Sequence, residues 1–390
     1  MTLAPPISEA HIPPAAASAA PRRVLYLINT LGTGGTERNV RMFCQHIDQS
    51  RYLPEVWVLK GGGEFEHEIR DAGIAVRDLN RNWARSPWFA LKTAWQISRQ
   101  NVDLVHAFLP TIATYAALGR LMFGLRVPLI MSLGTTKMAN SKEEVIIRRF
   151  FPLTIDHIFA NSTSVAAYAK NLGFQESQTT IIPNGHNPHA FLRPINKEAV
   201  RDALGISSDE WMLIHVGRLI DTKRLEDLID AVALLEPRQY KFRVVLAGSG
   251  PLLQSLQGRI AELNLQHRFM FLGNRADVPD LLRAADMFVF PSEVEGLPNS
   301  IIEAGMARLP IVACQIMGVT DVLRDGQEGL LVPPRSPAAF AGAIQKMIED
   351  PELAGRLAAA AQQHCLQTYS IQGTLDKLYA AYDKCLEKNE

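Results

Sequence analysis

The sequence has little cysteine and no excess of charge of either sign. Its four cysteines lie far apart and without the CxxC spacing of metal sites, so they predict neither a disulfide framework nor a zinc site. The 40 basic and 40 acidic side chains give a formal net charge of zero. That balance argues against a protein that grips nucleic acid by its phosphates. We therefore expect reduced thiols, a cytoplasmic location and no nucleic-acid partner.

Long apolar runs are also missing. The uncharged stretch from Leu104 to Gly119 falls short of the roughly 18 apolar residues that span a bilayer, so no transmembrane helix is predicted. Residues 1–21 are rich in Pro and Ala but lack the basic start and apolar core of a secretory signal, which indicates a disordered tail. The 390 residues, 47% of them apolar, suffice for two or three domains with their own cores.

Short apolar runs alternate with amphipathic segments after the tail, which is the pattern of parallel sheets covered by helices. Several prolines between 183 and 194 interrupt this pattern, and we place a domain boundary there. The sequence predicts an α/β protein with one doubly wound domain over 22–187 and a second over 188–370. The predicted strands of the first domain are 24–28, 56–59, 102–105, 128–131, 157–160 and 180–182. Those of the second domain are 212–216, 243–247, 269–272, 287–290, 310–313 and 330–332.

Two helices stand out in the second half of the chain. Apolar residues fall on one face over 225–235, so that face is expected to bury against the sheet. Leu375, Leu378 and Tyr382 lie on one side of the segment 371–390, which predicts a final helix. The sequence does not indicate what this last helix packs on.

Ligands of open parallel sheets bind at the carboxyl ends of the strands, so the chemistry is expected on the loops that follow strands. Gly34 and Gly35 follow the first predicted strand and precede a helix. The fingerprint of nicotinamide dinucleotide sites would need a glycine where Glu37 stands. The two glycines either permit the turn or let the backbone approach a ligand, and the sequence leaves both interpretations open.

Arg218 and Lys223 follow the first predicted strand of the second domain. Arginine offers a planar fork and lysine a point charge, and both match phosphate oxygens. With Arg224 they place positive charge at a helix start, where it is unfavourable. A diphosphate site accounts for these cations better than a solvated helix start does.

The densest signal is the segment from Phe290 to Glu303, where a strand ends and a helix begins. Pro298 suits the first helical position and Gly296 frees the backbone before it, so unpaired amides at the positive helix end would hold an anion. Glu303 is placed to accept hydrogen bonds from two sugar hydroxyls, and Glu295 lies nearer the reacting centre. Taken alone, the two glutamates could equally be surface residues.

In combination, these segments resemble the retaining GT-B glycosyltransferases of glycosyltransferase family 4. Glu295 and Glu303 reproduce the family motif of two glutamates with seven residues between them. Three further segments carry the resemblance: GRL and a later K over 217–223, GSGPL over 248–252 and IPNG over 182–185. The resemblance extends roughly from Arg22 to the C-terminus.

The resemblance implies two Rossmann-like domains facing across a cleft, with a UDP- or GDP-sugar donor mainly on the second and a glycan or lipid-linked acceptor mainly on the first. It implies catalytic roles for Arg218 and Lys223, because a departing diphosphate needs cations near it, and for Glu295, which matches the family's donor-sugar contact. The implied activity is that of a retaining, hexosyltransferase-type enzyme (EC 2.4) in surface polysaccharide or glycoconjugate synthesis. The implied donor-binding residues are Gly34, Gly35, Gly248, Gly296, Leu297, Pro298, Asn299, Ser300 and Glu303.

The first domain departs from the family pattern. After the predicted strand 102–105 the sequence keeps His106, but Phe108 stands where a second histidine is frequent. Thr135 lies in a segment where another frequent histidine is replaced. We expect His106 and Thr135 on the acceptor or sugar side, although His106 could instead be a buried histidine satisfied at a strand end. Asp321 stands where glutamate is usual, which keeps the carboxylate and shortens its reach.

No metal and no cofactor other than the donor are expected, because no Asp-any-Asp triplet occurs for a metal-bridged diphosphate. Two rival functions stay open: a UDP-sugar 2-epimerase of the same fold, and a catalytically silent protein that binds a nucleotide sugar. Incubation with UDP-GlcNAc and no acceptor separates the epimerase from a transferase.

A basic segment with interleaved apolar residues resembles the region where related enzymes touch membranes. Its members are Lys137, Lys142, Arg148, Arg149, Phe150 and Phe151. Peripheral contact with the inner face of the membrane is one interpretation, and a plain solvated helix is the other.

Overall fold

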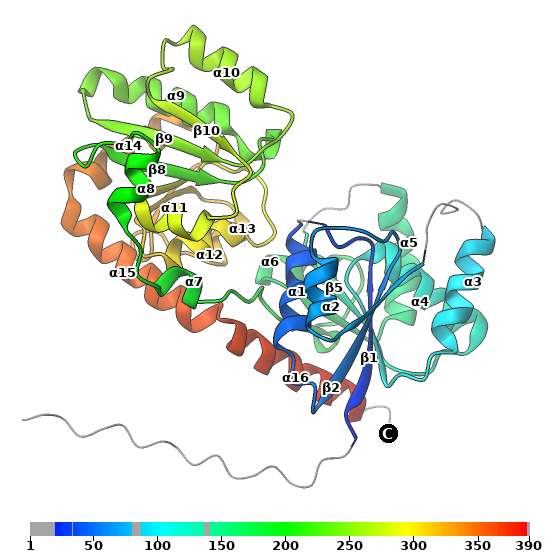
Figure 1. Cartoon of the computed structure of the whole chain (residues 1–390). Coiled ribbons are helices and arrows are strands. Elements are labelled where there is room, and N and C mark those ends of the chain that lie inside the picture. The colour runs from blue at the N-terminus through cyan, green and yellow to red at the C-terminus, as the bar shows by residue number, and fades with distance from the viewer. Residues whose placement is uncertain (1–19, 33, 80–86, 136–140, 388–390) are drawn as a thin grey trace, which may run out of the picture.

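Two parallel sheets build the molecule, which is a computed structural model that describes residues 20–32, 34–79, 87–135 and 141–387 (Figure 1). Nearly all of the predicted tail lies outside these residues. The first sheet has the strand order β3-β2-β1-β4-β5-β6-β7. Its strands are β1 (Arg22–Ile28), β2 (Tyr52–Val58), β3 (Ala75–Asp78), β4 (Leu104–Ala107), β5 (Leu129–Leu133), β6 (His157–Ala160) and β7 (Thr179–Ile181).

The first sheet is covered on both faces. Val24, Tyr26 and Ile28 of β1 belong to one apolar cluster, while Leu25 and Leu27 belong to the other, as the alternation of side chains along a strand requires. The covering helices are α1 (Gly35–His46), α2 (Glu66–Asp71), α3 (Pro87–Ser98), α4 (Pro110–Phe123), α5 (Ser141–Thr154) and α6 (Thr163–Asn171).

Strand β3 was not predicted. It lies at the edge of the sheet, and only Val76 of its four residues is buried. A strand with so little apolar surface gives almost no periodic signal in the sequence. The six predicted strands of this domain are confirmed, with bounds that shift by up to four residues.

The second sheet has the order β10-β9-β8-β11-β12-β13, and all six of its predicted strands are present. They are β8 (Trp211–Val216), β9 (Phe242–Ala247), β10 (Phe269–Gly273), β11 (Met287–Phe290), β12 (Ile311–Cys314) and β13 (Leu330–Val332). The helices around this sheet and the linker are α7 (His189–Leu192), α8 (Lys197–Ala203), α9 (Leu225–Leu235), α10 (Leu253–Glu262), α11 (Val278–Ala284), α12 (Asn299–Met306), α13 (Met317–Thr320), α14 (Pro337–Glu349) and α15 (Pro351–Thr368). Single-turn helices are η2 (Glu176–Gln178), η3 (Asp221–Lys223) and η4 (Glu236–Arg238).

Each sheet reverses its strand order once. The reversal lies between β1 and β4 in the first sheet and between β8 and β11 in the second. At such a point the two following loops diverge to opposite faces of the sheet, which leaves room for a ligand at the carboxyl ends of the strands.

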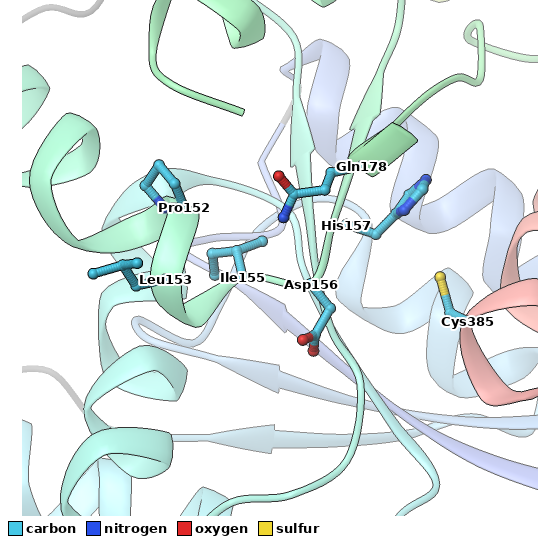
Figure 2. A pocket seen from close by; sticks show the side chains of 7 residues that line it. All are labelled: Pro152, Leu153, Ile155, Asp156, His157, Gln178 and Cys385. Atoms are coloured by element: carbon cyan, nitrogen blue, oxygen red, sulfur yellow. The ribbon is translucent and has the colours of Figure 1, made fainter. Parts of the chain in front are cut away.

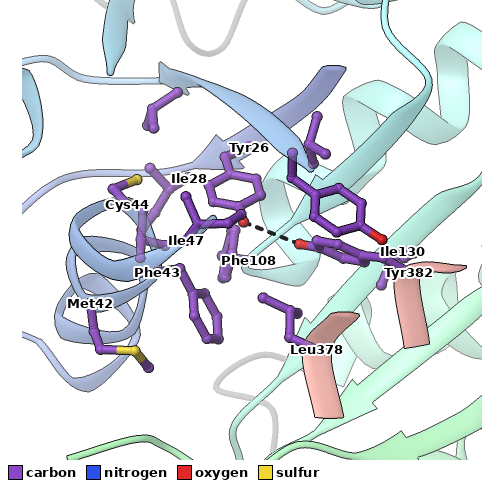
Figure 3. Close-up of a cluster of buried hydrophobic side chains, with 14 of the residues drawn as sticks. Tyr26, Ile28, Met42, Phe43, Cys44, Ile47, Phe108, Ile130, Leu378 and Tyr382 are labelled. Atoms are coloured by element: carbon purple, nitrogen blue, oxygen red, sulfur yellow. Dashed lines mark hydrogen bonds between the residues drawn. The ribbon is translucent and has the colours of Figure 1, made fainter. Parts of the chain in front are cut away.

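The final helix, α16 (Ile371–Glu387), follows α15 in sequence but packs on the first sheet (Figure 1). Leu378 and Tyr382 enter the cluster that also holds Tyr26 and Phe43 (Figure 3). Tyr379 stacks on Tyr52 with ring centroids 5.5 Å apart. The docking site that the sequence left open is thus the first domain. Within the described ranges, every helix is too short or too polar to cross a bilayer.

Candidate active site

Two loops meet at the reversal point of the second sheet, where β8 and β11 pair in parallel. The loop after β8 carries Arg218 and, in η3, Lys223; the loop after β11 carries Glu295. The Lys223 ammonium donates a hydrogen bond to Oε1 of Glu295, and both side chains are largely buried. The structure therefore brings two of the three predicted catalytic residues into contact.

The cations of this loop have different surroundings. Lys223 Nζ lies 5.1 Å from the ring centroid of Phe290, close enough for a cation–π contact. Arg224 is engaged elsewhere, because its guanidinium pairs with Asp227 at 2.8 Å. Arg218 is exposed, and its side chain has no hydrogen bond or ion pair with another described residue. Arg218 is thus the member of this loop that can turn to an incoming anion without giving up a partner.

Helix α12 begins behind this loop. Pro298 is its N-cap, so the prediction that it occupies the first helical position is wrong by one residue. The helix proper starts at Asn299 and Ser300, whose backbone N–H groups belong to the first turn and lack intrahelical acceptors. Leu297 is buried in an apolar cluster of the second domain and anchors the loop. An anion placed at this end would meet free amides and a positive helix end.

Gly296 brings the loop against the first domain. A Cβ built on Gly296 would stand 2.5 Å from the carbonyl oxygen of Gly134 and 3.6 Å from Cα of Thr135. The Ser162 hydroxyl donates to the carbonyl oxygen of Gly296 at 3.3 Å. Only glycine allows this approach, so its role is close contact between domains. Thr135 is exposed and lies beside the loop that carries Glu295.

Glu303 lies on α12 and faces the first domain and the linker. Its Oε1 is 3.7 Å from Nη1 of Arg38 and 3.7 Å from Nδ1 of His186. Burial raises the pKa of the Glu303 carboxyl to about 6, and the Arg38 charge opposes that rise. A buried carboxylate with only distant partners retains capacity to accept hydrogen bonds, as a pair of ribose hydroxyls would demand.

Asn299 joins α12 to the first domain. Nδ2 of Asn184 donates to Oδ1 of Asn299 at 2.7 Å, and Nδ2 of Asn39 donates to Oδ1 of Asn184. A Cβ on Gly35 would stand 3.4 Å from Nδ2 of Asn299, and Gly34 is the N-cap of α1. Of the two glycines predicted on the donor side, Gly35 is therefore placed next to α12, and Gly34 directly precedes it at the start of α1.

Gly248 supports the loop after β8 from behind. Its φ of 149° is one that other residues rarely adopt, and a Cβ there would stand 1.9 Å from the carbonyl oxygen of Gly217. The backbone of the GSGPL segment therefore packs directly on the loop that carries Arg218. Gly248 acts through that packing, and the structure does not place it at the Lys223–Glu295 pair.

His106 is fully buried at the end of β4, and both ring nitrogens have partners. Nδ1 lies 2.7 Å from the Tyr382 hydroxyl and Nε2 lies 2.8 Å from the Ser132 hydroxyl. Phe108 stacks on the ring with centroids 4.0 Å apart, and burial lowers the pKa of His106 to about 3. The expected sugar contact is corrected here: the structure matches the alternative of a satisfied histidine at a strand end.

Asp321 also makes a contact between domains. Its Oδ2 accepts a hydrogen bond from the backbone N–H of Ser164 at 3.1 Å, in the first turn of α6. A carboxylate is favourable at a helix N-terminus. The shortened side chain therefore reaches the first domain.

Sequence reasoning missed the residues that hold α12 against the first domain and the linker. They are Arg38, Asn39, Asn184 and His186. Only Asn184 carried a signal, as part of the IPNG segment. The others became visible only when distant parts of the chain came together.

A separate hollow of about 230 Å³ lies on the first domain near α16 (Figure 2). It is lined by Pro152, Leu153, Ile155, Asp156, His157, Gln178 and Cys385. None of the predicted site residues belongs to it, so it is not part of the candidate site. Among the described residues, no three His, Cys, Asp or Glu side chains gather as a metal site would need.

Two family models match the chain. The model described as Glycosyltransferase Family 4 matches residues 33–190, and the model described as Glycosyl transferases group 1 matches residues 196–364. Together they cover every strand of both sheets except β1, and they include the Glu295–Glu303 segment. The chain belongs to the group 1, family 4 glycosyltransferases. The sequence resemblance is thereby confirmed, and the epimerase alternative is not favoured. The two parallel-sheet domains, with the solved structures described below, confirm the predicted GT-B fold.

Named relatives of this chain come from several bacteria. The putative glycosyltransferase EpsD of Bacillus subtilis is 30% identical over 48% of this chain and 50% of its own length. Alpha-D-kanosaminyltransferase of Streptomyces kanamyceticus is 31% identical over 47% of this chain and 48% of its own length. The chain thus spans about half the length of these relatives. The lipopolysaccharide core biosynthesis mannosyltransferase LpsB of Rhizobium meliloti is 24% identical over 80% of this chain and 85% of its own length.

Solved structures share the fold of this chain. Anabaena Alr3699/HepE in complex with UDP-glucose superposes with a TM-score of 0.83 at 22% identity, over 93% of this chain and 100% of that chain. WaaG, a glycosyltransferase of lipopolysaccharide biosynthesis, gives a TM-score of 0.71 at 16% identity, over 91% and 98% of the two chains. At this identity the likeness shows the fold alone.

Proposed function

We propose that this glycosyltransferase moves a sugar from a UDP- or GDP-sugar to a hydroxyl of a glycan or lipid-linked acceptor, with retention of anomeric configuration. The observation that carries the proposal is the gathering of Lys223, Glu295 and the start of α12 at one reversal point, in contact with the first domain. Cations and free amides suit a leaving diphosphate, which is where transfer of a glycosyl group develops charge. The named relatives, among them a mannosyltransferase and a kanosaminyltransferase, support a hexosyl group.

In this proposal each residue has one task. Glu303 accepts hydrogen bonds from the ribose hydroxyls, because it is buried with only distant partners. Arg218 and Lys223 bind the diphosphate, and Lys223 exchanges part of its pairing with Glu295 for phosphate oxygens. Glu295 then orients the donor sugar. Attack comes from the face of the leaving group, and the leaving phosphate oxygen receives the acceptor proton.

The test begins with donor binding. We expect UDP or GDP, and one of their sugars, to raise the melting temperature, since a ligand that binds the native state stabilises it in proportion to RT ln(1 + [L]/Kd). Release of the nucleoside diphosphate should then require an acceptor. Absence of any thermal shift with all nucleotide sugars would refute the proposal. Binding without transfer over a wide acceptor panel would favour the catalytically silent protein.

We further propose that the reaction needs no metal ion. The cations of the loop after β8 supply the charge that a metal would provide elsewhere. Turnover should therefore be the same after dialysis against EDTA and after addition of Mg²⁺ or Mn²⁺. Loss of turnover on chelation, restored by one metal, would contradict this part.

A contact of the first domain with the inner face of the membrane also belongs to the proposal. On α5, Phe150 and Leu153 are 50% and 76% exposed, and Arg149 beside them is exposed. Trp88 on α3 is 79% exposed. Helix α3 packs on α4, and α4 packs on α5. Exposed aromatic and basic side chains on α5 suit an anionic lipid surface, and Trp88 adds an exposed aromatic ring on another helix of the same domain.

Two members of the predicted membrane segment do not contribute as expected. Phe151 is buried in the apolar cluster of the first domain that also holds Leu25 and Leu27. Arg148 pairs with Glu144 at 3.0 Å. Lys137 lies outside the described residues. Of the two predicted phenylalanines only Phe150 is exposed, and Leu153, which was not predicted, adds apolar surface beside it.

Vesicle sedimentation tests the contact. We expect binding to vesicles of phosphatidylglycerol at low salt, weaker binding at high salt and little binding to phosphatidylcholine. Phe150→Ser with Leu153→Ser should reduce binding, while the control Leu234→Ser, which removes a half-exposed leucine from the second domain, should not. No sedimentation with anionic vesicles at either salt concentration would remove the proposal.

A further inference from the structure

The chain passes between the two domains twice, and the two passages are hydrogen-bonded to each other at His186. The backbone N–H of His186 donates to the carbonyl oxygen of Tyr369 at 2.8 Å, and the N–H of Ile371 donates to the carbonyl oxygen of His186 at 3.0 Å. A Cβ on Gly185 would stand 3.1 Å from Cα of Ile371. The backbone of His186 is therefore fixed where the linker crosses the α15–α16 junction.

The side chain of His186 points from this crossing to the donor-side helix. Nδ1 lies 3.7 Å from Oε1 of Glu303, and the two side chains are 10% and 13% exposed. The other ring nitrogen, Nε2, is buried and meets no hydrogen-bond partner among the described residues, while the Asn299 side chain also interacts with the ring. Arg38, on α1 of the first domain, lies 3.7 Å from the same oxygen of Glu303. The carboxylate is thus approached from the first domain and from the linker at once.

The charge state of the ring decides what this contact does. Burial lowers the pKa of His186 to about 4, so the imidazole is neutral near pH 7 and carries one N–H. With its proton on Nδ1, the neutral ring presents a donor to the Glu303 carboxylate, because that nitrogen faces the acceptor. At 3.7 Å the contact is longer than a hydrogen bond of about 3.0 Å, so a small shift of Glu303 toward the ring would complete it.

We propose that His186 is a positioning residue of the donor site. Its Nδ1–H orients the Glu303 carboxylate toward the ribose of the nucleotide sugar. Its backbone hydrogen bonds to Tyr369 and Ile371 hold the ring in place where the two interdomain segments cross. The inference rests on the proposed function, in which Glu303 binds ribose.

The chain offers matched variants for a test. In His186→Asn the amide nitrogen takes the place of Nδ1, so the donor to Glu303 is kept. In His186→Leu a side chain of similar bulk has no donor, and in His186→Gln the amide nitrogen takes the place of Nε2. His189→Leu is the control, because His189 is exposed on the same linker.

The measurement is calorimetric binding at pH 7.5 of UDP or GDP, whichever the unaltered protein binds, and of its 2′-deoxy counterpart. Loss of a hydrogen bond to a charged group should weaken binding of the 2′-deoxy compound about 10-fold or more in the unaltered protein. We expect that ratio to be kept in His186→Asn and His189→Leu, and to fall to about 3-fold or less in His186→Leu and His186→Gln. A role of His186 in folding alone would not change the ratio.

The outcomes separate this inference from the proposed function. If the unaltered protein binds neither nucleotide, the proposed function fails. If it binds one and discriminates against the 2′-deoxy form, but His186→Leu keeps the full ratio, only the inference fails. Should His186→Leu not fold, the comparison of Asn with Gln decides, and equal ratios in those two variants overturn the inference. Binding without any 2′-deoxy discrimination overturns it as well.

Discussion

Lys223 and Glu295 form an ion pair whose side chains are only 14% and 13% exposed. Removing one member of such a pair leaves the other charge buried without compensation, so a variant of Lys223 confounds catalysis with stability. Arg218 has no such liability, because it is exposed and pairs with no other described residue. The cleanest test of a leaving-group role is therefore made at Arg218.

Arg218→Ala should lower kcat about 100-fold or more at an unchanged melting temperature, following the usual loss on removing a preorganised charge partner. Lys223→Ala should lower kcat by a similar factor and also lower the melting temperature. The matched control is Lys241→Ala, whose exposed side chain pairs with Asp209 far from the loop after β8. Near-normal turnover in both Arg218→Ala and Lys223→Ala would contradict the role.

Glu303 should make donor binding depend on pH. Burial raises the pKa of its carboxyl to about 6, and the ionised form accepts hydrogen bonds from the two ribose hydroxyls more strongly than the protonated form does. Affinity is therefore full above pH 6 and falls as the pH drops through about 6, because binding must then release a proton. Calorimetry with a nucleotide sugar measures this, since its diphosphate has no terminal phosphate to titrate near 6.

In Glu303→Gln the affinity should be low at every pH and the dependence around pH 6 should disappear. Glu293→Gln is the control, because Glu293 pairs with Arg335 on the surface. An unchanged pH profile in Glu303→Gln would assign the titration to another group.

The loop before α12 can lie against the first domain because residue 296 is glycine. Gly296→Ala should lower kcat/KM at least 10-fold, because the new Cβ would stand 2.5 Å from the Gly134 carbonyl oxygen and force the two loops apart. Gly342→Ala in the middle of α14 meets nothing within 4 Å and should raise stability by about 0.5–1 kcal/mol through helix propensity. Steady-state kinetics and thermal unfolding of both variants check this. Unchanged kinetics in Gly296→Ala would show that the two loops move independently.

Periodicity predicted the elements well where they are apolar. All four residues of β11 are buried, so its apolar run stands out against its neighbours. The β3 strand was missed because one buried residue makes no pattern. The predicted start of α12 was wrong by one residue. An N-cap and a first helical residue differ in backbone angles, and the sequence does not encode that difference.

At the scale of the whole molecule, α16 ties the end of the chain to the first domain. The Tyr382 hydroxyl lies 2.7 Å from His106 Nδ1. It also lies 3.3 Å from the Tyr26 hydroxyl, inside the apolar cluster shown in Figure 3. His106 in turn reaches Ser132 on β5, which leads to the loop of Gly134. The packing of α16 is therefore continuous with the segment that contacts Gly296.

Tyr382→Phe should lower the free energy of unfolding by about 1–3 kcal/mol, since His106 Nδ1 is left buried without a partner. Urea denaturation followed by circular dichroism measures the loss. Tyr240→Phe removes a hydroxyl on the surface and should leave the unfolding midpoint almost unchanged. Equal midpoints for the two variants would mean that the His106 contact adds no stability.

The sequence by itself determined the two sheets, the loops that follow their strands and the residue types able to hold a diphosphate. These depend on neighbours within about ten residues, through apolar periodicity, turn residues and charge. Only the tertiary structure decided that His106 is buried under Tyr382, that α16 packs on the first domain, and that Arg38 and His186 meet at Glu303. The physical reason is that these contacts join residues more than a hundred positions apart. Burial and the direction of a side chain are set there by packing, which leaves no trace in local spacing.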